Sequence, residues 1–331
     1  MPVGGTALAF RHALLWTRAE GVDSACPFDV TVPPPEAEPL LAAISAERVV
    51  LLPGLDADRP AVMGTLNVTP DSFSDGGRFL DPGAAVAAGE AMRDAGADIL
   101  DIGGESTRPG AVPVPPEEEQ RRILPVIRAL ARGGPVSVDT RHAATMRAAL
   151  DAGAAIVNDV SGLEHDPDAT SVVAEARCPV VLMHMRGTPE TMRGLAQYRD
   201  VVLDVAEELG QRLDAALAAG IARARIILDP GIGFAKTAEQ NLHLLARLGV
   251  LLQHGCPLLV GVSRKSFIGH YGGEPDPMRR LPGSLAAGLA ALAAGASILR
   301  VHDVAETVQA IAVWRAVGAA CAASRLVDGS T

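Results

Sequence analysis

The chain has 331 residues, of which 48% are hydrophobic and 21% are charged, an ordinary balance for a folded protein with a large apolar core. Aromatic residues make up only 3%, so the core has to be built from Ala, Val, Leu and Ile. The formal net charge of −10 argues against a general nucleic-acid binder, which needs a basic face. A local cluster of Arg and Lys could still bind a small anion.

Residues 1–60 differ from the rest of the chain. They contain three consecutive prolines (33–35), a possible short helix over 36–46 and an apolar stretch at 49–52. An earlier apolar stretch, 7–16, is interrupted by Arg11 and His12, so it lacks the core of a signal peptide, and no run approaches the length of a membrane span. We interpret 1–60 as an N-terminal extension that leads into a covering segment.

The cysteines Cys26, Cys178, Cys256 and Cys321 are scattered and form no CxxC pair. This pattern suits reduced thiols better than a disulfide framework or a zinc site. We therefore expect a cytoplasmic protein with neither a membrane nor a nucleic acid as partner.

From residue 61 short apolar runs alternate with longer Ala- and Leu-rich segments of helical period, which is typical of βα units and a parallel sheet. Glycines such as Gly96 and Gly295 stand where helices should end. The expected strands are 61–67, 99–103, 136–139, 155–159, 180–184, 226–229, 258–262 and 298–302. The expected helices are 84–94, 117–131, 143–152, 203–219, 239–253, 285–294 and 304–317. Eight strands in this rhythm predict an α/β fold, a (β/α)8 TIM barrel over 61–325, with a doubly wound open sheet as the alternative.

Each expected strand ends in polar or Gly-rich sequence. In a TIM barrel these ends lie on one face, where the active sites of this fold are found. A single Asp at a strand end is usually a helix cap, but eight polar ends in register are hard to explain by capping. The sequence therefore predicts an active site at this face.

Acceptor side chains end three of these strands: Asp139, Asn158 and Asp229. Together they could bind a flat heterocycle that offers amino and ring N–H donors. Buried carboxylates need partners, so Lys265 or water would have to reach them. An ion-pair network at the barrel mouth is the alternative interpretation.

A second set of side chains is basic. It comprises Arg108, Lys265, Arg300 and His302, with Thr107 and Ser266 nearby. The segments after the seventh and eighth strands form the usual phosphate site of a barrel, and Arg suits bidentate contacts with phosphoryl oxygens. This set is therefore expected to bind a phosphorylated group, with surface solvation of the charges as the alternative.

The first two loops of the barrel are rich in Gly, Pro, Ser and Asp, and suit lids that close over a substrate. Phe73 lies in the first loop, where it could pack at a hinge or cover an aromatic substrate. Competing motifs are weak: residues 231–236 hold two glycines of a dinucleotide fingerprint, but Lys236 replaces the third. The histidines show no metal-ligand spacing, so any metal should be Mg²⁺ bound together with substrate oxygens.

Eight segments of the chain resemble the dihydropteroate synthases, a pterin-binding family. They are 63–77, 101–110, 137–140, 158–162, 182–185, 228–234, 263–267 and 300–303. The first two motifs are highly specific, and the resemblance covers about residues 61–320. The family usually reaches its first motif sooner, so residues 1–45 inherit no role from the resemblance.

The resemblance implies a role for each site residue. Asp139, Asn158, Asp229 and Lys265 would hold the pterin ring, with Met183, Gly261 and Phe234 lining its pocket. Asn67, Thr107, Arg108, Arg300 and His302 would hold the pyrophosphate and its Mg²⁺, with Asn67 as the metal ligand. Phe73, Pro109, Lys265 and Ser266 would shape the p-aminobenzoate pocket. The expected catalytic residues among them are Lys265, Arg300, His302 and Asp139.

By the same resemblance the chain would be a homodimeric transferase of folate biosynthesis. It would condense 6-hydroxymethyl-7,8-dihydropterin pyrophosphate with p-aminobenzoate to give 7,8-dihydropteroate and pyrophosphate. Two alternatives stay open. A related pterin-binding methyltransferase would not need the Arg108 loop and segment 263–267 together, and a catalytically silent paralogue would be expected to lose pyrophosphate-site residues.

Overall fold

The computed structural model describes residues 12–19, 22–46, 55, 59–69, 81–106, 113–188 and 190–328. From Ala61 onward strands and helices alternate. The strands are β3 (Ala61–Asn67), β4 (Ile99–Gly103), β5 (Val136–Asp139), β6 (Ile156–Asp159), β7 (Val180–Met183), β8 (Ile226–Asp229), β9 (Leu259–Val260) and β10 (Ile298–Val301). The helices between and after them are α2 (Pro82–Asp94), α3 (Pro116–Leu130), α4 (Ala143–Asp151), α5 (Ala169–Ala176), α6 (Val201–Ala218), α7 (Ala238–Ala246), α8 (Ser266–Gly272), α9 (Leu281–Ala293) and α10 (Val304–Asp328).

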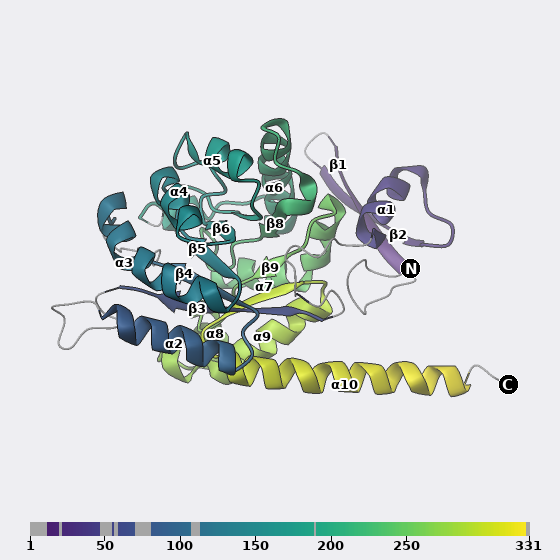
Figure 1. Cartoon of the computed structure of the whole chain (residues 1–331). Coiled ribbons are helices and arrows are strands. Elements are labelled where there is room, and N and C mark those ends of the chain that lie inside the picture. Colours follow the sequence, from purple (N-terminus) through teal and green to yellow (C-terminus); the bar gives the residue numbers. More distant parts are fainter. Residues whose placement is uncertain are drawn as a thin grey trace.

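The eight strands form one parallel sheet in the order β8-β7-β6-β5-β4-β3-β10-β9 (Figure 1). A further parallel bridge joins Leu228 of β8 to Leu258, the residue before β9, so the two outermost strands meet. A doubly wound sheet would leave these two strands unpaired at its edges. The prediction of a TIM barrel is therefore confirmed, and the open-sheet alternative is wrong.

The predicted strands and most helices agree with the structure to within a few residues. The expected helix 239–253 is divided into α7 and a 3-10 helix, η5 (Leu248–His254), and α10 continues past 317 to Asp328. Helices α5 and α8 were not predicted, because segments of eight and seven residues contain too few turns for a clear period. The positive φ angles of Gly96 (99°) and Gly295 (100°) confirm the two expected helix ends.

The barrel core has two parts, because side chains alternate between the two faces of each strand. Residues such as Leu100 and Ile102 of β4 point outward and pack under the surrounding helices. Ile99, on the other face of the same strand, points into the barrel, where it meets the corresponding residues of other strands. Burial of both faces explains why apolar residues predominate in the strands.

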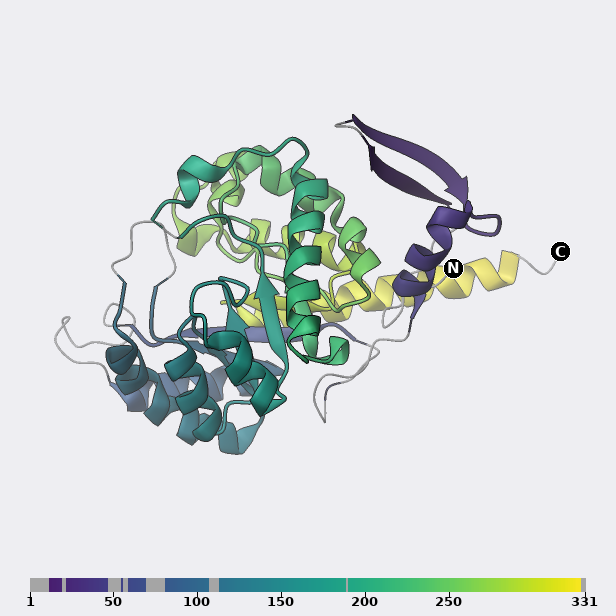
Figure 2. The ribbon, with the colours of Figure 1, turned by 90° about the horizontal axis from the view of Figure 1, so that it is seen from above.

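The N-terminal elements lie outside the ring of helices (Figure 2). Strands β1 (His12–Ala19) and β2 (Val22–Asp29) pair antiparallel, and α1 (Glu38–Ser45) follows them. Arg18 of β1 contacts Asp204 of α6 at 2.8 Å, and α1 packs against η5. Helix α1 confirms the short helix expected over 36–46, whereas the hairpin was not predicted.

Helix α1 lies at the end of the barrel where β3 begins (Figure 1), whereas the hairpin lies along the outside of α6 and reaches Arg199, before α6, through Asp23 at 2.9 Å. The apolar stretch 49–52 lies outside the described residues. In the part of the chain that the structure describes, no helix is both long and apolar enough to cross a membrane. The cytoplasmic location and the domain boundary at residue 60 stay predictions.

Candidate active site

Along five of the strands, β3, β4, β6, β8 and β10, the interior of the barrel changes from apolar to polar within two residues. We call the first set the lower layer: Met63, Ile99, Ile156, Val181, Ile227, Leu259 and Ile298. Two positions further toward the carboxyl ends lies the upper layer: Thr65, Asp101, Asn158, Met183, Asp229, Gly261 and Arg300, to which β5 adds Asp139, in register with Asn158. A strand places residues i and i+2 on the same face, so both layers point inward. All members of the upper layer except Asp101 line one cavity at this end of the barrel.

Arg300 is the centre of an ion-pair network in the upper layer. Its Nε donates to Oδ2 of Asp101 at 2.6 Å, and a terminal nitrogen donates to Oδ2 of Asp139 at 2.7 Å. Nδ2 of Asn158 donates to the same oxygen of Asp101 at 3.0 Å. Burial opposes the charge of Arg300, but the two carboxylates more than compensate and raise its pKa. The network therefore joins β4, β5, β6 and β10 beneath the cavity.

Among the described residues, Asp139 and Asp229 are the two carboxylates that line the cavity, and both are buried. Burial raises the pKa of Asp139 to about 7, against the favourable charge of Arg300. Burial also raises the pKa of Asp229, against a 2.7 Å hydrogen bond from the backbone N–H of Gly231 and the charge of Lys265. The protein's own donors therefore stabilise these carboxylates incompletely, which suits a pocket for a donor-rich ligand.

Lys265 covers the ring of Phe234 at one side of the cavity, with its Nζ 4.3 Å from the ring centroid. The neighbouring Arg264 has a φ of 60° and donates its Nε to Asp303 at 3.1 Å, which fixes the loop after β9. Gly233 has a φ of 84°, and a Cβ there would lie 3.1 Å from Cδ of Lys265. Glycine at this position therefore leaves room for the lysine stem.

His302 and Asn67 stand at the carboxyl ends of β10 and β3. Nδ1 of His302 lies 3.0 Å from Oγ of Ser263, and the backbone N–H of His302 donates to the same oxygen at 3.2 Å. Asn67 is half-buried beside Gly103, and among the described residues no hydrogen bond engages its side-chain amide. An amide oxygen is a hard ligand that Mg²⁺ takes together with water and phosphate oxygens, so Asn67 fits the expected metal position.

Comparisons with known proteins agree with this geometry. The family described as "Pterin binding enzyme" matches residues 63–302. A dihydropteroate synthase from Synechocystis sp. is 48% identical over 263 residues, which cover 78% of this chain and 91% of that protein. The chain belongs to the pterin-binding enzymes, in the group of dihydropteroate synthases.

Two solved structures of the Xanthomonas albilineans dihydropteroate synthase resemble this chain. One contains 4-aminobenzoic acid; it is 52% identical, has a TM-score of 0.75, and the match covers 79% of this chain and 94% of that one. The other contains 7,8-dihydropteroate; it is 49% identical, has a TM-score of 0.73, and the match covers 80% of this chain and 96% of that one. The match to dihydropteroate synthases favours this activity over the methyltransferase alternative.

The barrel brings all the expected pterin residues, and two of those expected at the pyrophosphate, together around the cavity. These are Asp139, Asn158, Met183, Asp229, Phe234, Gly261, Lys265, Arg300 and His302. Ser266, the first residue of α8, is exposed and does not line the cavity. Phe73, Thr107, Arg108 and Pro109 lie outside the described residues. The roles assigned to all these residues stay predictions.

The division into an acidic and a basic set does not describe the geometry fully. Arg300 was expected with the pyrophosphate, but here it pairs with two carboxylates of the upper layer. The ion-pair interpretation of the acidic residues thus holds for Asp139, whereas Asp229 is bonded to backbone. The two interpretations are compatible, because a half-buried arginine can balance carboxylates that also accept hydrogen bonds from a ligand.

Sequence reasoning missed several residues that line the cavity: Thr65, Val160, Gly231, Ile232 and Ser263. Thr65 could have been found by counting two residues on from Met63 along an inward-facing strand. Asp101 was noted as part of a motif but not as a site residue, although it holds both Arg300 and Asn158.

A second charged cluster lies beside the cavity and includes residues that follow Asp139 directly in sequence. Ligand atoms of Glu105, Glu119 and His142 lie within 4.8 Å of one another. Arg141 donates to both oxygens of Glu105, at 2.9 and 3.1 Å, and Oε2 of Glu119 accepts from Thr140 at 2.9 Å. The hydrogen bond with Glu119 raises the pKa of His142. We interpret the cluster as a charge-compensated network, since Arg141 already balances one of its two carboxylates.

Proposed function

We propose that this enzyme condenses 6-hydroxymethyl-7,8-dihydropterin pyrophosphate with p-aminobenzoate, giving 7,8-dihydropteroate and pyrophosphate. The observation that carries the proposal is the polar upper layer. Within a chain of this family, buried acceptors at the ends of β5, β6 and β8 face one cavity beside Lys265 and Phe234. A flat ring with several N–H donors satisfies such acceptors. If the cavity bound only water, the burial of these polar side chains would have no explanation.

The pterin ring is proposed to bind with its N–H groups toward Asp139, Asn158 and Asp229. As the methylene carbon loses its leaving group, positive charge spreads into the ring. Ionised Asp139 and Asp229 stabilise that charge more than the ground state, so they favour early cleavage of the C–O bond. Because the protein stabilises these two negative charges incompletely, they interact strongly with the positive charge that develops in the transition state.

The pyrophosphate is proposed to lie at the mouth of the cavity, near Arg300 and His302. Arg300 is held between Asp101 and Asp139, so its orientation is fixed before any ligand binds. Mg²⁺ bound with the pyrophosphate would neutralise part of the leaving group's charge, and Asn67 is the residue that would hold it. Thr107 and Arg108 complete this end of the proposed site.

p-Aminobenzoate is proposed to bind beside Lys265 and Ser266, under Phe73 and Pro109. Its arylamine is a neutral nucleophile, so it attacks the methylene carbon without prior removal of a proton. No residue of the chain is therefore assigned as a general base. The proton leaves after the C–N bond has formed.

The decisive experiment is an assay of pyrophosphate release from the dihydropterin substrate with and without p-aminobenzoate. Release that depends on p-aminobenzoate, with formation of 7,8-dihydropteroate, is the expected result. Pyrophosphate release that is independent of p-aminobenzoate, or the absence of release by folded protein, would refute the proposed function. We also propose a homodimer, which light scattering can test directly.

A further inference from the structure

Lys236 lies directly behind the pterin pocket, in the segment that follows β8, and the proposed reaction gives it no role. Its Nζ is 3.0 Å from the carbonyl oxygens of both Gly231 and Phe234, and 2.9 Å from Nδ1 of His184. An ammonium group has three N–H donors, so all of them are used. Gly231 and Phe234 line the pterin cavity, which means that Lys236 holds its wall from the outside.

The orientation of Lys236 depends on His184, which is fully buried at the end of β7. Nδ1 of His184 accepts from Lys236, so the ring proton is on Nε2, which lies 2.9 Å from Oε2 of Glu208. Burial lowers the pKa of His184 to about 3, which keeps the ring neutral. Although burial acts against it, hydrogen bonds from His184 and Arg186 lower the pKa of Glu208 to about 2. Glu208 therefore stays ionised and keeps the tautomer that Lys236 requires.

The turn held by Lys236 also packs closely on His184. Gly231 has a φ of 66°, and a Cβ there would lie 2.0 Å from the carbonyl oxygen of His184. The backbone N–H of Gly231 in turn donates to Oδ1 of Asp229. A continuous chain of contacts thus leads from Glu208 through His184, Lys236 and Gly231 to the carboxylate of Asp229.

We propose that Lys236 is a positioning residue of the pterin pocket: oriented by His184 and Glu208, its ammonium group fixes the turn at 231–234 and sets a positive charge behind Asp229. The inference rests on the proposed function, because it takes this pocket to bind a pterin. It adds a role for three polar residues that do not themselves line the cavity: the buried His184 and the half-buried Lys236 and Glu208.

The charges around these groups make the role testable by pH. Asp229 is faced by Lys265 and Arg300, and by Lys236 from behind. Burial lowers the pKa of Lys236 to about 7, while Asp229 and Glu208 act to raise it and Arg212 and Lys265 to lower it. Removing the ammonium group takes one of three favourable charges from Asp229. The pKa of Asp229 must then rise further. As the pH is lowered, the loss of pterin binding should therefore begin at a higher pH than in the wild type.

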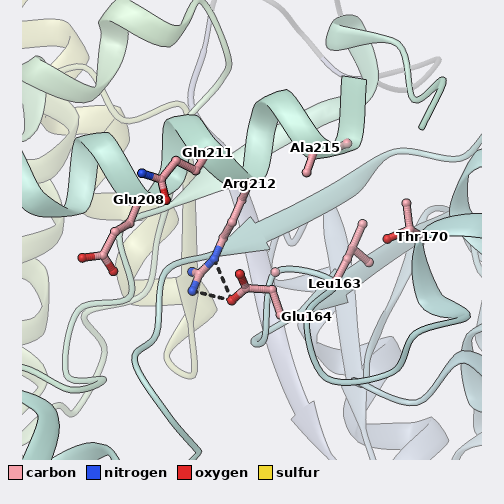
Figure 3. Close-up of a pocket in the computed structure, with 9 residues that line it drawn as sticks. Leu163, Glu164, Thr170, Glu208, Gln211, Arg212 and Ala215 are labelled. Carbon is pink, nitrogen blue, oxygen red and sulfur yellow. Dashed lines mark hydrogen bonds and ion pairs between the residues drawn. The ribbon is translucent and has the colours of Figure 1, made fainter. Parts of the chain in front are cut away.

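Arg212 offers a matched control, since it is a second positive charge in the same region. It follows Glu208 by one turn of α6 (Figure 3). It pairs with Glu164 at 2.7 Å and donates to the carbonyl oxygens of Met183 (2.7 Å) and Met185 (2.8 Å). Its hydrogen bonds thus hold the segment after β7 and not the turn after β8.

The test measures the Kd of 7,8-dihydropteroate by calorimetry between about pH 5 and 9, for the wild type, Lys236→Met and Arg212→Met. Wild-type affinity should decline toward acid as Asp229 and Asp139 become protonated. Lys236→Met should move this decline upward by roughly one pH unit, which is about a tenfold loss of affinity on the acid side. Arg212→Met should lower Tm but leave the decline at its wild-type pH. Asp139, which Arg300 faces, contributes equally in all three proteins.

A lower Tm with an unmoved acid decline in Lys236→Met would overturn the inference, and so would equal shifts in both variants. If Lys236→Met does not fold, Glu208→Gln replaces it, because the amide keeps the shape but frees the tautomer of His184. In Glu208→Gln, a smaller shift of the acid decline in the same direction would support the inference, and the absence of any shift would refute it. Failure of the wild type to bind 7,8-dihydropteroate at any pH would instead refute the proposed function, and the inference with it.

Discussion

The lower and upper layers of the barrel interior lie on the same strands, two residues apart, yet they differ in nearly every property. The lower layer consists of close-packed aliphatic side chains and Met63. The upper layer contains buried carboxylates, an amide and an arginine, and it includes the unpartnered buried atoms Thr65 Oγ1 and Asp101 Oδ1. The outward-facing residues of the same strands are apolar, with the exception of Asp159 at the end of β6.

This difference shows how one strand pattern can serve two needs. Aliphatic burial in the lower layer contributes directly to the free energy of folding. Burial of charge in the upper layer works against folding, because the carboxylates exchange water for few protein donors. The upper layer therefore depends on the lower layer and the outer core for its stability, and substitutions in the two layers should have opposite consequences.

The largest effect is expected in the lower layer of β8. Ile227→Ala removes a fully buried side chain from a packed interior, which should lower the free energy of unfolding by about 2–5 kcal/mol. Urea denaturation measures this loss. The folded fraction should still bind 7,8-dihydropteroate within a few-fold of the wild type. A large loss of affinity without loss of stability would show that the two layers are not separate.

The matching substitution lies two residues along the same strand. Asp229→Asn replaces an acceptor oxygen by a donor that faces the pterin, so the free energy of binding should weaken by about 2–4 kcal/mol. Calorimetry with a pterin ligand measures the loss, and circular dichroism shows whether the barrel remains folded. Near-normal affinity in the folded variant would remove Asp229 from the pocket.

A smaller effect concerns the stability of the same variant. Burial raises the pKa of Asp229 above its unfolded value, so its contribution to stability is fully present at low pH and is lost as pH rises through the folded pKa. Asn does not titrate. The Tm of Asp229→Asn should therefore rise relative to the wild type as pH increases from about 4 toward neutrality. A Tm difference that is constant over this range would mean that the carboxylate is not destabilised by burial.

Much of this arrangement could be predicted, because its signals are local. Apolar runs located the eight strands, and polar residues at their ends located the site. The partners of Arg300 could not be predicted: Asp101 is 199 residues away, and the contact depends on closure of the barrel between β10 and β3. Lys236 was noted only as a misfit in a glycine motif, because its partners His184 and Glu208 come from other elements. The hairpin was missed because its apolar residues follow no strict alternation, although only Glu20 and Gly21 separate its strands.

The smallest effect on turnover is expected from the N-terminal segment, because its hairpin lies outside α6, its helix α1 packs against η5, and none of its described residues lines the cavity. Deleting residues 1–30 removes the hairpin, whose described contacts with α6 are ion pairs that contribute little free energy. Deleting 1–45 also removes α1, whose Leu41 is buried, so it should lower Tm further. Both proteins should keep turnover within a few-fold of the full chain, as measured by pyrophosphate release. A folded truncation at 45 that loses turnover would show that the segment supports the upper layer from a distance, and the separation between the segment and the site would have to be abandoned.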